Sequence, residues 1–475
     1  MRDTFSPAKS ASMKKWSLVL SLCLFVTLSQ AHIRLPAVIS SNMVLQQQST
    51  VKLWGWCSPS EKITVTTSWN NKTDSFKGTR DANWQVAIQT PAAGGPYTIT
   101  IKGKNTIVLE NILIGEVWVC SGQSNMEWGY QQKLQDIVNE LPTCYNSNIR
   151  FFQIPKTTSA HPQDNCDATW TVCDSNTLKT FSAVGYFFGK NLNKNLNVPI
   201  GLIGSNWGGT PAEVWTPEAV VNNDPQLKEA AAKQKPSDGW PFTPGITYNA
   251  MIFPIINYPI AGTIWYQGES NTGTASTYGK LFTSMIDAWR KAWNKDFPFY
   301  YVQIAPYKYG DKNIGALLRE QQTKSMTHPN TGMVVITDLV ADTNNIHPTD
   351  KHDVGARLAN WALSETYKKE GIAYKSPMFK SMEVKKDKAY LTFDNAPNGL
   401  EIKGKTAAEL YIAGSDQQFY PAEAKIEKDK LVVWSKQVKE PVAVRFGFSN
   451  TAIGNIFSKE GLPVGPFRTD DWEVK

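Results

Sequence analysis

Continuous apolar segments alternate with amphipathic segments through the middle of this 475-residue chain, and this alternation restricts the fold more than any other feature. The apolar segments cover residues 112–120, 198–204, 260–267, 299–304 and 333–339. The amphipathic stretches have helical spacing and cover residues 184–192, 278–293 and 350–367. A strand that is apolar on both sides must be buried on both faces, as in a parallel sheet covered by helices. The pattern therefore predicts an α/β fold.

The regions on either side of this middle part have the shorter apolar–polar alternation of antiparallel β-structure. Before it, the alternating segments are 51–56, 62–66, 84–88 and 97–101; after it, they are 389–393, 408–412, 431–434 and 442–448. We therefore expect a β-rich N-terminal domain over residues 32–106, an α/β domain over 107–371 and a β-rich C-terminal region over 372–475.

The first 31 residues have the pattern of an export signal with an upstream extension. Met13 begins a positively charged stretch, residues 16–28 are apolar, and residues 29–31 fit a small-x-small cleavage site. The apolar run is too short to span a bilayer, and the sequence shows no other run of this kind. We expect cleavage near Ala31, a mature chain that starts at His32 in the periplasm or outside the cell, and no membrane anchor.

Composition argues against two classes of function. The formal net charge of +7 is not concentrated in a block of Lys and Arg, so a nucleic-acid partner is not expected. The five His show no His-x-x-x-His spacing and the Cys no Cys-x-x-Cys spacing, so neither a metal nor another cofactor is expected. The 17 Trp suit a protein that stacks sugar rings on aromatic faces, although most of them are expected in the core.

The cysteines fit an oxidising compartment only in part. Five remain once the signal is removed, and an odd number leaves at least one free thiol. Cys120 lies on a predicted buried strand and is expected to be the free one. Cys166 and Cys173 are close enough in sequence to form a small bridge, with Cys144 as a competing partner.

Four polar turns at the ends of the apolar segments hold groups that can carry out acyl transfer. Ser124 follows the first segment, in a turn where a hydroxyl is exposed as a nucleophile. Gly208 and Gly209 follow the second, where a backbone N–H can approach an oxyanion, and Asn271 follows the third with a further donor. His347 lies on a loop just before a helix, as a general base would. Each turn alone also fits an ordinary turn, loop or helix cap, but together they predict one site.

The order Ser, Gly, Asn, His resembles the SGNH hydrolases, and the wording of the motifs resembles the sialate O-acetylesterase family. The resemblance extends over most of the mature chain. It is carried by Gly115-Glu116-Val117-Trp118, Ser121-Gly122-Gln123-Ser124-Asn125-Met126, Trp207-Gly208-Gly209-Thr210-Pro211, Trp265-Tyr266-Gln267-Gly268-Glu269-Ser270-Asn271, and Ile346-His347-Pro348 followed by Val354-Gly355-x-Arg357-Leu358-Ala359. It implies the three-layer fold of SGNH hydrolases around the parallel sheet.

The resemblance also implies a role for each residue. Ser124 would be the nucleophile and His347 the base. The oxyanion hole would consist of the Ser124 N–H, the N–H of Gly208 or Gly209, and the side chain of Asn271. Gln123 and Glu269 would organise the loops that carry Ser124 and Asn271.

The acid of the triad is the point where the sequence departs from the family. Bacterial members often have Asp-Ile-His-Pro, whereas this chain has Asn345 two residues before His347, and Asn344 three residues before it. Three explanations stay open: Asp342 or Asp338 orients His347; a backbone carbonyl does so and a Ser–His dyad suffices; or the enzyme is impaired.

The expected function is that of a secreted carbohydrate O-acetylesterase, a carboxylic ester hydrolase that deacetylates O-acetylated sialic acid through a serine acyl-enzyme. The alternatives are an acetylxylan or other polysaccharide acetylesterase and, in another class, an inactive glycan-binding protein on an esterase scaffold. A sialate pocket should offer an Arg to the sugar carboxylate, for which Arg319 and Arg150 are candidates by region. The oligomeric state is left open.

Overall fold

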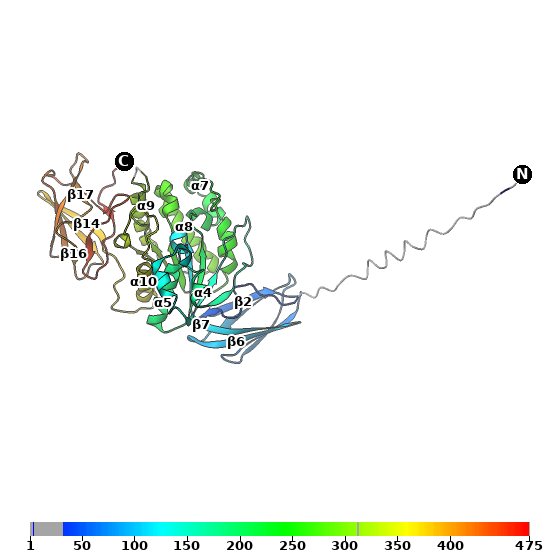
Figure 1. Ribbon diagram of the computed structural model, residues 1–475. Coiled ribbons are helices and arrows are strands. Elements are labelled where there is room, and N and C mark those ends of the chain that lie inside the picture. The colour runs from blue at the N-terminus through cyan, green and yellow to red at the C-terminus, as the bar shows by residue number, and fades with distance from the viewer. Residues whose placement is uncertain (1–2, 4–31, 311–312, 475) are drawn as a thin grey trace.

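A computed structural model describes residue 3, residues 32–310 and residues 313–474. Figure 1 shows a central body of helices around a sheet, with one strand-rich region at each end of the chain. The predicted export signal lies outside the described residues, apart from Asp3 in its upstream extension. Among the described residues, no helix combines the length and the apolar character needed to cross a membrane.

The central sheet is parallel except for one edge strand. Its order is β13 (Thr331–Val334), β12 (Phe299–Val302), β11 (Gly262–Tyr266), β7 (Thr106–Gly122), β10 (Ile200–Asn206), β8 (Asn146–Gln153) and the antiparallel β9 (Trp170–Cys173). Each of the five predicted apolar segments overlaps a strand of this sheet. The last strand ends at Val334, before the predicted end at residue 339, and a 3-10 helix follows at Thr337–Leu339.

Helices cover both faces of the sheet, and the side chains of β7 alternate between them. Val117 and Val119 join a core with α8 (Ala275–Trp293) and α9 (Ile314–Lys324). Trp118 and Cys120 join a second core with α5 (Ala183–Leu196) and α10 (Lys351–Trp361). The predicted α/β fold with a parallel sheet is therefore confirmed. The last predicted helix changes at Ala362 into a π-helical turn that ends at Thr366.

Short helices occupy the connections between these elements. They are α2 (Ser124–Glu127), α3 (Gln135–Glu140), α4 (Ser175–Leu178), α6 (Glu218–Asn222) and α7 (Pro225–Ala231).

Strand β7 belongs to two sheets at once. Its first part pairs with β6 (Gly94–Lys102) and β1 (Val44–Gln46), and its second part pairs with β10 and β11. β3 (Lys62–Thr67) and β4 (Thr73–Lys77) extend the N-terminal part, while β2 (Thr50–Trp56) pairs with β5 (Asn83–Gln89). The strand-rich N-terminal region is thus continuous with the central sheet. The predicted domain boundary at 106/107 falls at the first residues of β7 and stays a prediction, as does the boundary at 371/372.

The C-terminal region forms its own small sheets around its own core. They are β14 (Met378–Lys385), β15 (Lys388–Asp394), β20 (Lys430–Trp434) and β19 (Glu423–Glu427); β18 (Phe419–Pro421), β17 (Leu410–Ala413), β21 (Ala443–Phe446) and β23 (Phe467–Arg468); and the pair β16 (Leu400–Ile402) and β22 (Ile456–Ser458). Arg468 forms an ion pair with Glu320 of α9 and so joins this region to the body.

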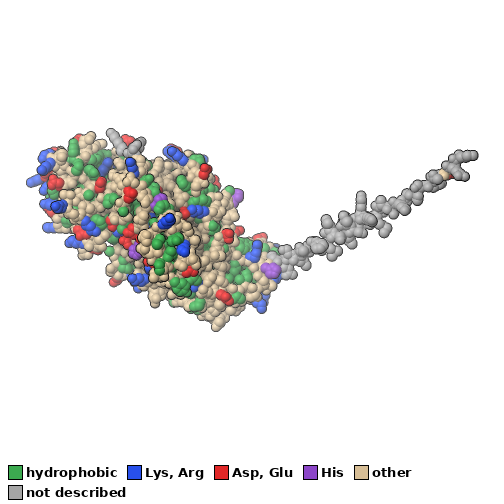
Figure 2. Space-filling view, in the orientation of Figure 1, with side chains coloured by type: hydrophobic (Ala, Val, Ile, Leu, Met, Phe, Trp, Pro, Cys, Tyr) green, Lys and Arg blue, Asp and Glu red, His purple; other side chains and the backbone are tan. Residues whose placement is uncertain are grey.

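The expected disulfide is absent. All five described cysteines, including Cys166 and Cys173, are free thiols. The Cys173 thiol instead donates to the carbonyl oxygen of Cys144, 3.2 Å away. On the face in Figure 2, basic and acidic side chains are interspersed. The absence of a nucleic-acid partner stays a prediction.

Candidate active site

The turn after β7 is shaped by its contact with the neighbouring strand β11. Gly122 has φ +136°, and a Cβ there would lie 2.2 Å from the carbonyl oxygen of Tyr266. The same oxygen accepts the N–H of Gln123 at 3.0 Å. Only glycine fits such a close approach at this φ. The turn therefore ends the buried strand abruptly and places Ser124 at the first position of α2.

The structure brings Ser124 and His347 together. Ser124 Oγ and His347 Nε2 are 2.8 Å apart, although the two residues are 223 positions apart in the sequence. The imidazole stacks on Trp128, with ring centroids 3.7 Å apart and an interplanar angle of 19°. The backbone N–H of His347 donates to Asn345 Oδ1 at 3.0 Å. These contacts fix the ring plane and aim one ring nitrogen at the hydroxyl, as a nucleophile–base pair requires.

The imidazole is held in its neutral form. Burial and, to a smaller extent, the nearby charge of Lys351 lower the pKa of His347 to about 4. A neutral ring has a free lone pair on Nε2 at neutral pH, so it can accept the proton of the Ser124 hydroxyl.

Neither predicted acid has a recorded bond to His347. Asp342 is exposed, and its Oδ1 accepts the backbone N–H and the side-chain amide of Asn344 at 2.8 and 3.0 Å. Asp338 binds Arg357 through both oxygens, at 2.8 and 2.6 Å. Within the described part of the chain, no carboxylate is among the hydrogen-bond partners of His347. The assignment of an acid stays a prediction, with the dyad as its alternative.

Gly208 lies beside the nucleophile, with its N–H already occupied. A Cβ on Gly208 would lie 3.2 Å from the Cβ of Ser124. The Gly208 N–H donates to Glu127 Oε2 at 2.5 Å, and the other oxygen of Glu127 binds Lys156 at 2.6 Å. The carboxylate of Glu127 thus accepts the hydrogen bond of the backbone N–H that was predicted for the oxyanion hole. Gly209 follows with φ +81°, and its carbonyl accepts the Ser270 hydroxyl at 2.8 Å.

Asn271 is buried in the loop that follows β11. Its Oδ1 accepts the Ala212 N–H at 2.9 Å and the Gln267 amide at 2.7 Å, and its Nδ2 donates to Glu213 at 2.8 Å. Burial raises the pKa of Glu213. These bonds hold Ala212, three residues after Gly209, to the loop of Asn271. Donation by Asn271 to an oxyanion stays a prediction.

The two predicted organising residues bridge the Ser124 and Asn271 loops. Gln123 Oε1 accepts the N–H groups of Gly268 and Ser270 at 3.3 and 3.4 Å. Glu269 Oε1 accepts the side-chain amide of Asn125 at 2.6 Å. These bonds connect the turn after β7 to the turn after β11.

A buried lysine extends this connection to the loop of His347. Lys351 Nζ donates to Asn125 Oδ1 at 2.6 Å, and Asn125 Nδ2 also donates to the carbonyl of Ile346 at 3.1 Å. Burial lowers the pKa of Lys351 to about 7, and burial raises the pKa of Glu269. Asn125 is therefore the centre of a chain Lys351–Asn125–Glu269 that holds together the loops of Ser124, Asn271 and His347.

Lys351 and Glu127 were not predicted from the sequence. A lysine in the first turn of an amphipathic helix normally faces solvent, so the pattern held no signal that Lys351 is buried. Glu127 lies three residues after Ser124, which places both on one face of a helical turn. That spacing is the one signal by which Glu127 could have been found.

The two arginines suggested for a sugar carboxylate lie elsewhere. Arg150 is buried and donates to Ser147 O, Asn42 Oδ1 and Asn111 Oδ1. Arg319 is buried and donates to the carbonyls of residues 449 and 450. Both guanidinium groups are occupied by structural contacts.

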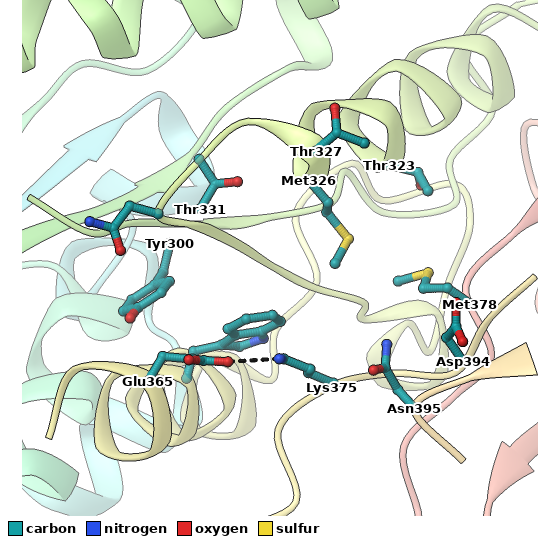
Figure 3. A pocket seen from close by; sticks show the side chains of 12 residues that line it. Tyr300, Thr323, Met326, Thr327, Thr331, Glu365, Lys375, Met378, Asp394 and Asn395 are labelled. Atoms are coloured by element: carbon teal, nitrogen blue, oxygen red, sulfur yellow. Dashed lines mark ion pairs between the residues drawn. The ribbon is translucent and has the colours of Figure 1, made fainter. Parts of the chain in front are cut away.

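A cavity lies away from Ser124, between the body and the C-terminal region. It has a volume of about 640 Å³ and lies near the first residue of β13 and the last turn of α10, at the amino ends of the parallel strands. Figure 3 shows the ion pair of Glu365 and Lys375 on its wall, 2.7 Å long. Ligands of open α/β sheets bind at the opposite, carboxyl ends of the strands, where Ser124 and His347 are.

Comparisons with known proteins identify the family of the chain. Residues 114–364, more than half of the chain, match the family described as "Carbohydrate esterase, sialic acid-specific acetylesterase". The chain is similar to human sialate O-acetylesterase, with 29% identity over 413 residues that cover 79% of each protein. It is 29% identical to the rat protein of the same name over 432 residues, which cover 76% of this chain and 79% of the rat protein.

A solved structure extends the similarity to nearly the whole chain. The crystal structure of a carbohydrate acetylesterase from Xanthomonas citri superposes with a TM-score of 0.85 and 36% identity, covering 93% of this chain and 100% of the other. The chain therefore belongs to the carbohydrate esterase family of sialic acid-specific acetylesterases and is a carboxylic ester hydrolase.

Proposed function

We propose that this protein is a secreted O-acetylesterase that removes acetyl groups from O-acetylated sialic acid by a serine acyl-enzyme mechanism. The observation that carries the proposal is the 2.8 Å contact between Ser124 Oγ and His347 Nε2 at the carboxyl end of the sheet. The neutral imidazole, whose pKa is about 4, supports its role as base. The names of the similar human and rat proteins support the choice of sialic acid.

In this mechanism the Ser124 hydroxyl gives its proton to His347 Nε2 while Oγ attacks the acetyl carbonyl carbon. The tetrahedral oxyanion collapses, the C–O bond to the sugar breaks, and the sugar oxygen takes the proton from His347. Water then attacks the acetyl-Ser124 ester and gives its proton to His347. The bond from the carbonyl carbon to Ser124 Oγ breaks, Oγ takes the proton from His347, and acetate leaves. The oxyanion would be held by the Ser124 N–H, the N–H of Gly208 or Gly209, and Asn271. For Gly208 to serve, the carboxylate of Glu127 must give way to the substrate.

The base would act without a triad acid. The stacking of His347 on Trp128 supports a dyad, since it orients the imidazole without a carboxylate. The bond from the backbone N–H of His347 to Asn345 Oδ1 fixes the main chain that carries the ring. No metal or cofactor takes part in the proposed reaction. Secretion rests on the export signal predicted for residues 1–31.

The test is acetate release by the chain that starts at His32, with wild type and Ser124→Ala side by side. The substrates are 9-O-acetylated sialic acid and acetylated xylan. We expect wild type to release acetate from the sialic acid and Ser124→Ala to release none. Release from xylan alone would retain the mechanism and replace the substrate with an acetylated plant polysaccharide.

Labelling with a fluorophosphonate separates an enzyme from a glycan-binding protein on an esterase scaffold. We expect wild type to be labelled covalently at Ser124 and Ser124→Ala to remain unlabelled. An unlabelled wild type that binds acetylated glycans without releasing acetate would support the scaffold instead.

A further inference from the structure

A second hollow adjoins the Gly208–Gly209 turn. Its volume is about 270 Å³. Its lining includes Gly209, Trp240, Lys233, Lys235 and Ser270. We refer to it as the Trp240 cavity.

The Trp240 cavity is next to the nucleophile without containing it. Gly209, on its wall, directly follows Gly208. A Cβ added to Gly208 would lie 3.2 Å from the Cβ of Ser124. Ser270, also on its wall, donates its hydroxyl to the Gly209 carbonyl at 2.8 Å. A substrate with its acetyl group at Ser124 therefore has this cavity beside it, available for another part of the same molecule.

An aromatic ring forms one side of the cavity. Trp240 is 40% exposed, a high value for tryptophan. The indole packs on the backbone of Gly209, where a Cβ would lie 2.3 Å from the ring. The segment is fixed further by the Trp207 indole N–H, which donates to the Gly239 carbonyl at 3.2 Å. A fixed, exposed ring in a small cavity is suited to stack against the apolar face of a sugar.

The charged groups that line the cavity are both positive. Lys233 pairs with Glu229 at 2.9 Å, but both side chains are largely exposed, at 61% and 72%, so the pair is weak. No ion pair is recorded for Lys235 among the residues that the structure describes. No Asp or Glu lines the cavity, whereas the larger remote cavity contains Glu365 and Asp394. The Trp240 cavity is thus suited to an anionic ligand.

We propose that the Trp240 cavity is the subsite for an anionic sugar, with the ring against Trp240 and its carboxylate beside Lys235. The inference rests on the proposed function and adds the residues that recognise the sugar. The lysines take the place of Arg150 and Arg319, which are buried in structural contacts. Lysine binds a carboxylate as a point charge, so the subsite selects for charge more than for the planar geometry that arginine selects.

The test compares three esters: 9-O-acetylated sialic acid, its carboxyl methyl ester, and 4-nitrophenyl acetate, which has no sugar. The variants are Trp240→Ala and Lys235→Gln. Their matched controls are Trp69→Ala, in the N-terminal region, and Lys228→Gln, an exposed lysine on α7 that does not line the cavity. Thermal unfolding of each variant checks that it is folded.

We expect Trp240→Ala to raise KM for the sialic acid about tenfold, the equivalent of about 1.4 kcal/mol, and to leave 4-nitrophenyl acetate unchanged. Lys235→Gln should also raise KM for the acid, since it removes the positive charge that faces the carboxylate. Lys235→Gln should leave KM for the methyl ester unchanged. The controls should match wild type with all three esters.

An unchanged KM for the sialic acid in Trp240→Ala overturns the subsite. An equal effect of Lys235→Gln on acid and methyl ester overturns the recognition of a carboxylate. A wild type that hydrolyses 4-nitrophenyl acetate but neither sialic acid derivative overturns the proposed substrate, and this proposal with it. Failure of the subsite alone leaves wild-type turnover of the sialic acid intact, so the two failures are distinguishable.

Discussion

At the scale of single residues, the pH dependence of the reaction depends on the charge of Lys351. His347 acts as base only when neutral, and burial lowers its pKa to about 4, with Lys351 as the second cause. Activity should therefore be full above this pKa and fall as the pH drops through about 4. Lys351→Met removes the charge and should raise the pKa of His347 toward its usual 6.5. The acid limb of kcat/KM, which reports the free enzyme, should shift upward with it.

The measurement is kcat/KM for 4-nitrophenyl acetate between pH 3.5 and pH 8. Lys190→Met is the control, because Lys190 is a half-exposed lysine paired with Glu140 and has no recorded contact with the site. An acid limb that stays near pH 4 in Lys351→Met contradicts the electrostatic role. The same shift of the acid limb in both variants would mean that it follows from the net charge of the protein and not from the position of Lys351.

Whether Asp342 is the acid of a triad is also decided by a single residue, whereas near-normal activity without it leaves the dyad and Asp338. The Asp342 carboxylate binds Asn344, so Asp342→Ala should lower kcat by less than about tenfold. Loss of a true triad acid costs about 10⁴ in a serine protease. The measurement is kcat for the sialic acid substrate, with Ser124→Ala as the inactive reference. A fall of about 10⁴ in Asp342→Ala would identify Asp342 as the acid and end the dyad proposal.

The proximity of Ser124 and His347 could be predicted from the sequence because each residue follows a buried strand of one parallel sheet. Such strands end at a common edge, so residues far apart in the chain meet there. Lys351 and Glu127 were not predicted because their roles depend on tertiary contacts. Whether a lysine is buried beside an Asn–Glu pair cannot be derived from helical spacing.

At the scale of elements, the turn from β7 to α2 requires glycine at position 122. Alanine there would place a Cβ 2.2 Å from the Tyr266 carbonyl oxygen, at φ +136°. A strained backbone of this kind costs about 1–3 kcal/mol before the clash is counted. Gly122→Ala should therefore lower the free energy of unfolding by at least about 2 kcal/mol. It should also lower kcat, because the turn positions Ser124.

Urea denaturation and kcat measure the two effects. Gly414→Ala is the control, since its Cβ would meet its nearest atom at 3.4 Å and its φ is not positive. Its stability should stay within about 0.5 kcal/mol of wild type. Unchanged stability and kcat in Gly122→Ala would mean that the turn relaxes without cost.

Elements were predictable where the apolar pattern was continuous. β7 was expected over residues 112–120 but extends from Thr106 to Gly122, because its first part pairs with the N-terminal strands. β8 was not predicted, because Arg150 interrupts its apolar run. Strand ends depend on the strands they pair with, and a linear pattern does not contain that information.

At the scale of the whole molecule, two buried arginines connect the terminal regions to the body. Arg150, on β8, binds Asn42 and Asn111 of the N-terminal part. Arg319, on α9, binds the carbonyls of residues 449 and 450 near the C-terminus. Burial lowers the pKa of Arg319 to about 10, so its desolvation has to be offset by these hydrogen bonds. In this arrangement the arginines hold the three parts together.

Arg150→Leu and Arg319→Leu separate this role from sugar recognition. Each variant loses hydrogen bonds from a buried charged group, which contribute about 1.5–3 kcal/mol apiece. The free energy of unfolding should therefore fall by about 2–4 kcal/mol, whereas the exposed Arg80→Leu should change it by less than about 0.5 kcal/mol. KM for 9-O-acetylated sialic acid should match wild type in all three. A tenfold rise in KM with unchanged stability would instead place that arginine at the sugar carboxylate, and it would remove the reason for assigning that role to Lys235.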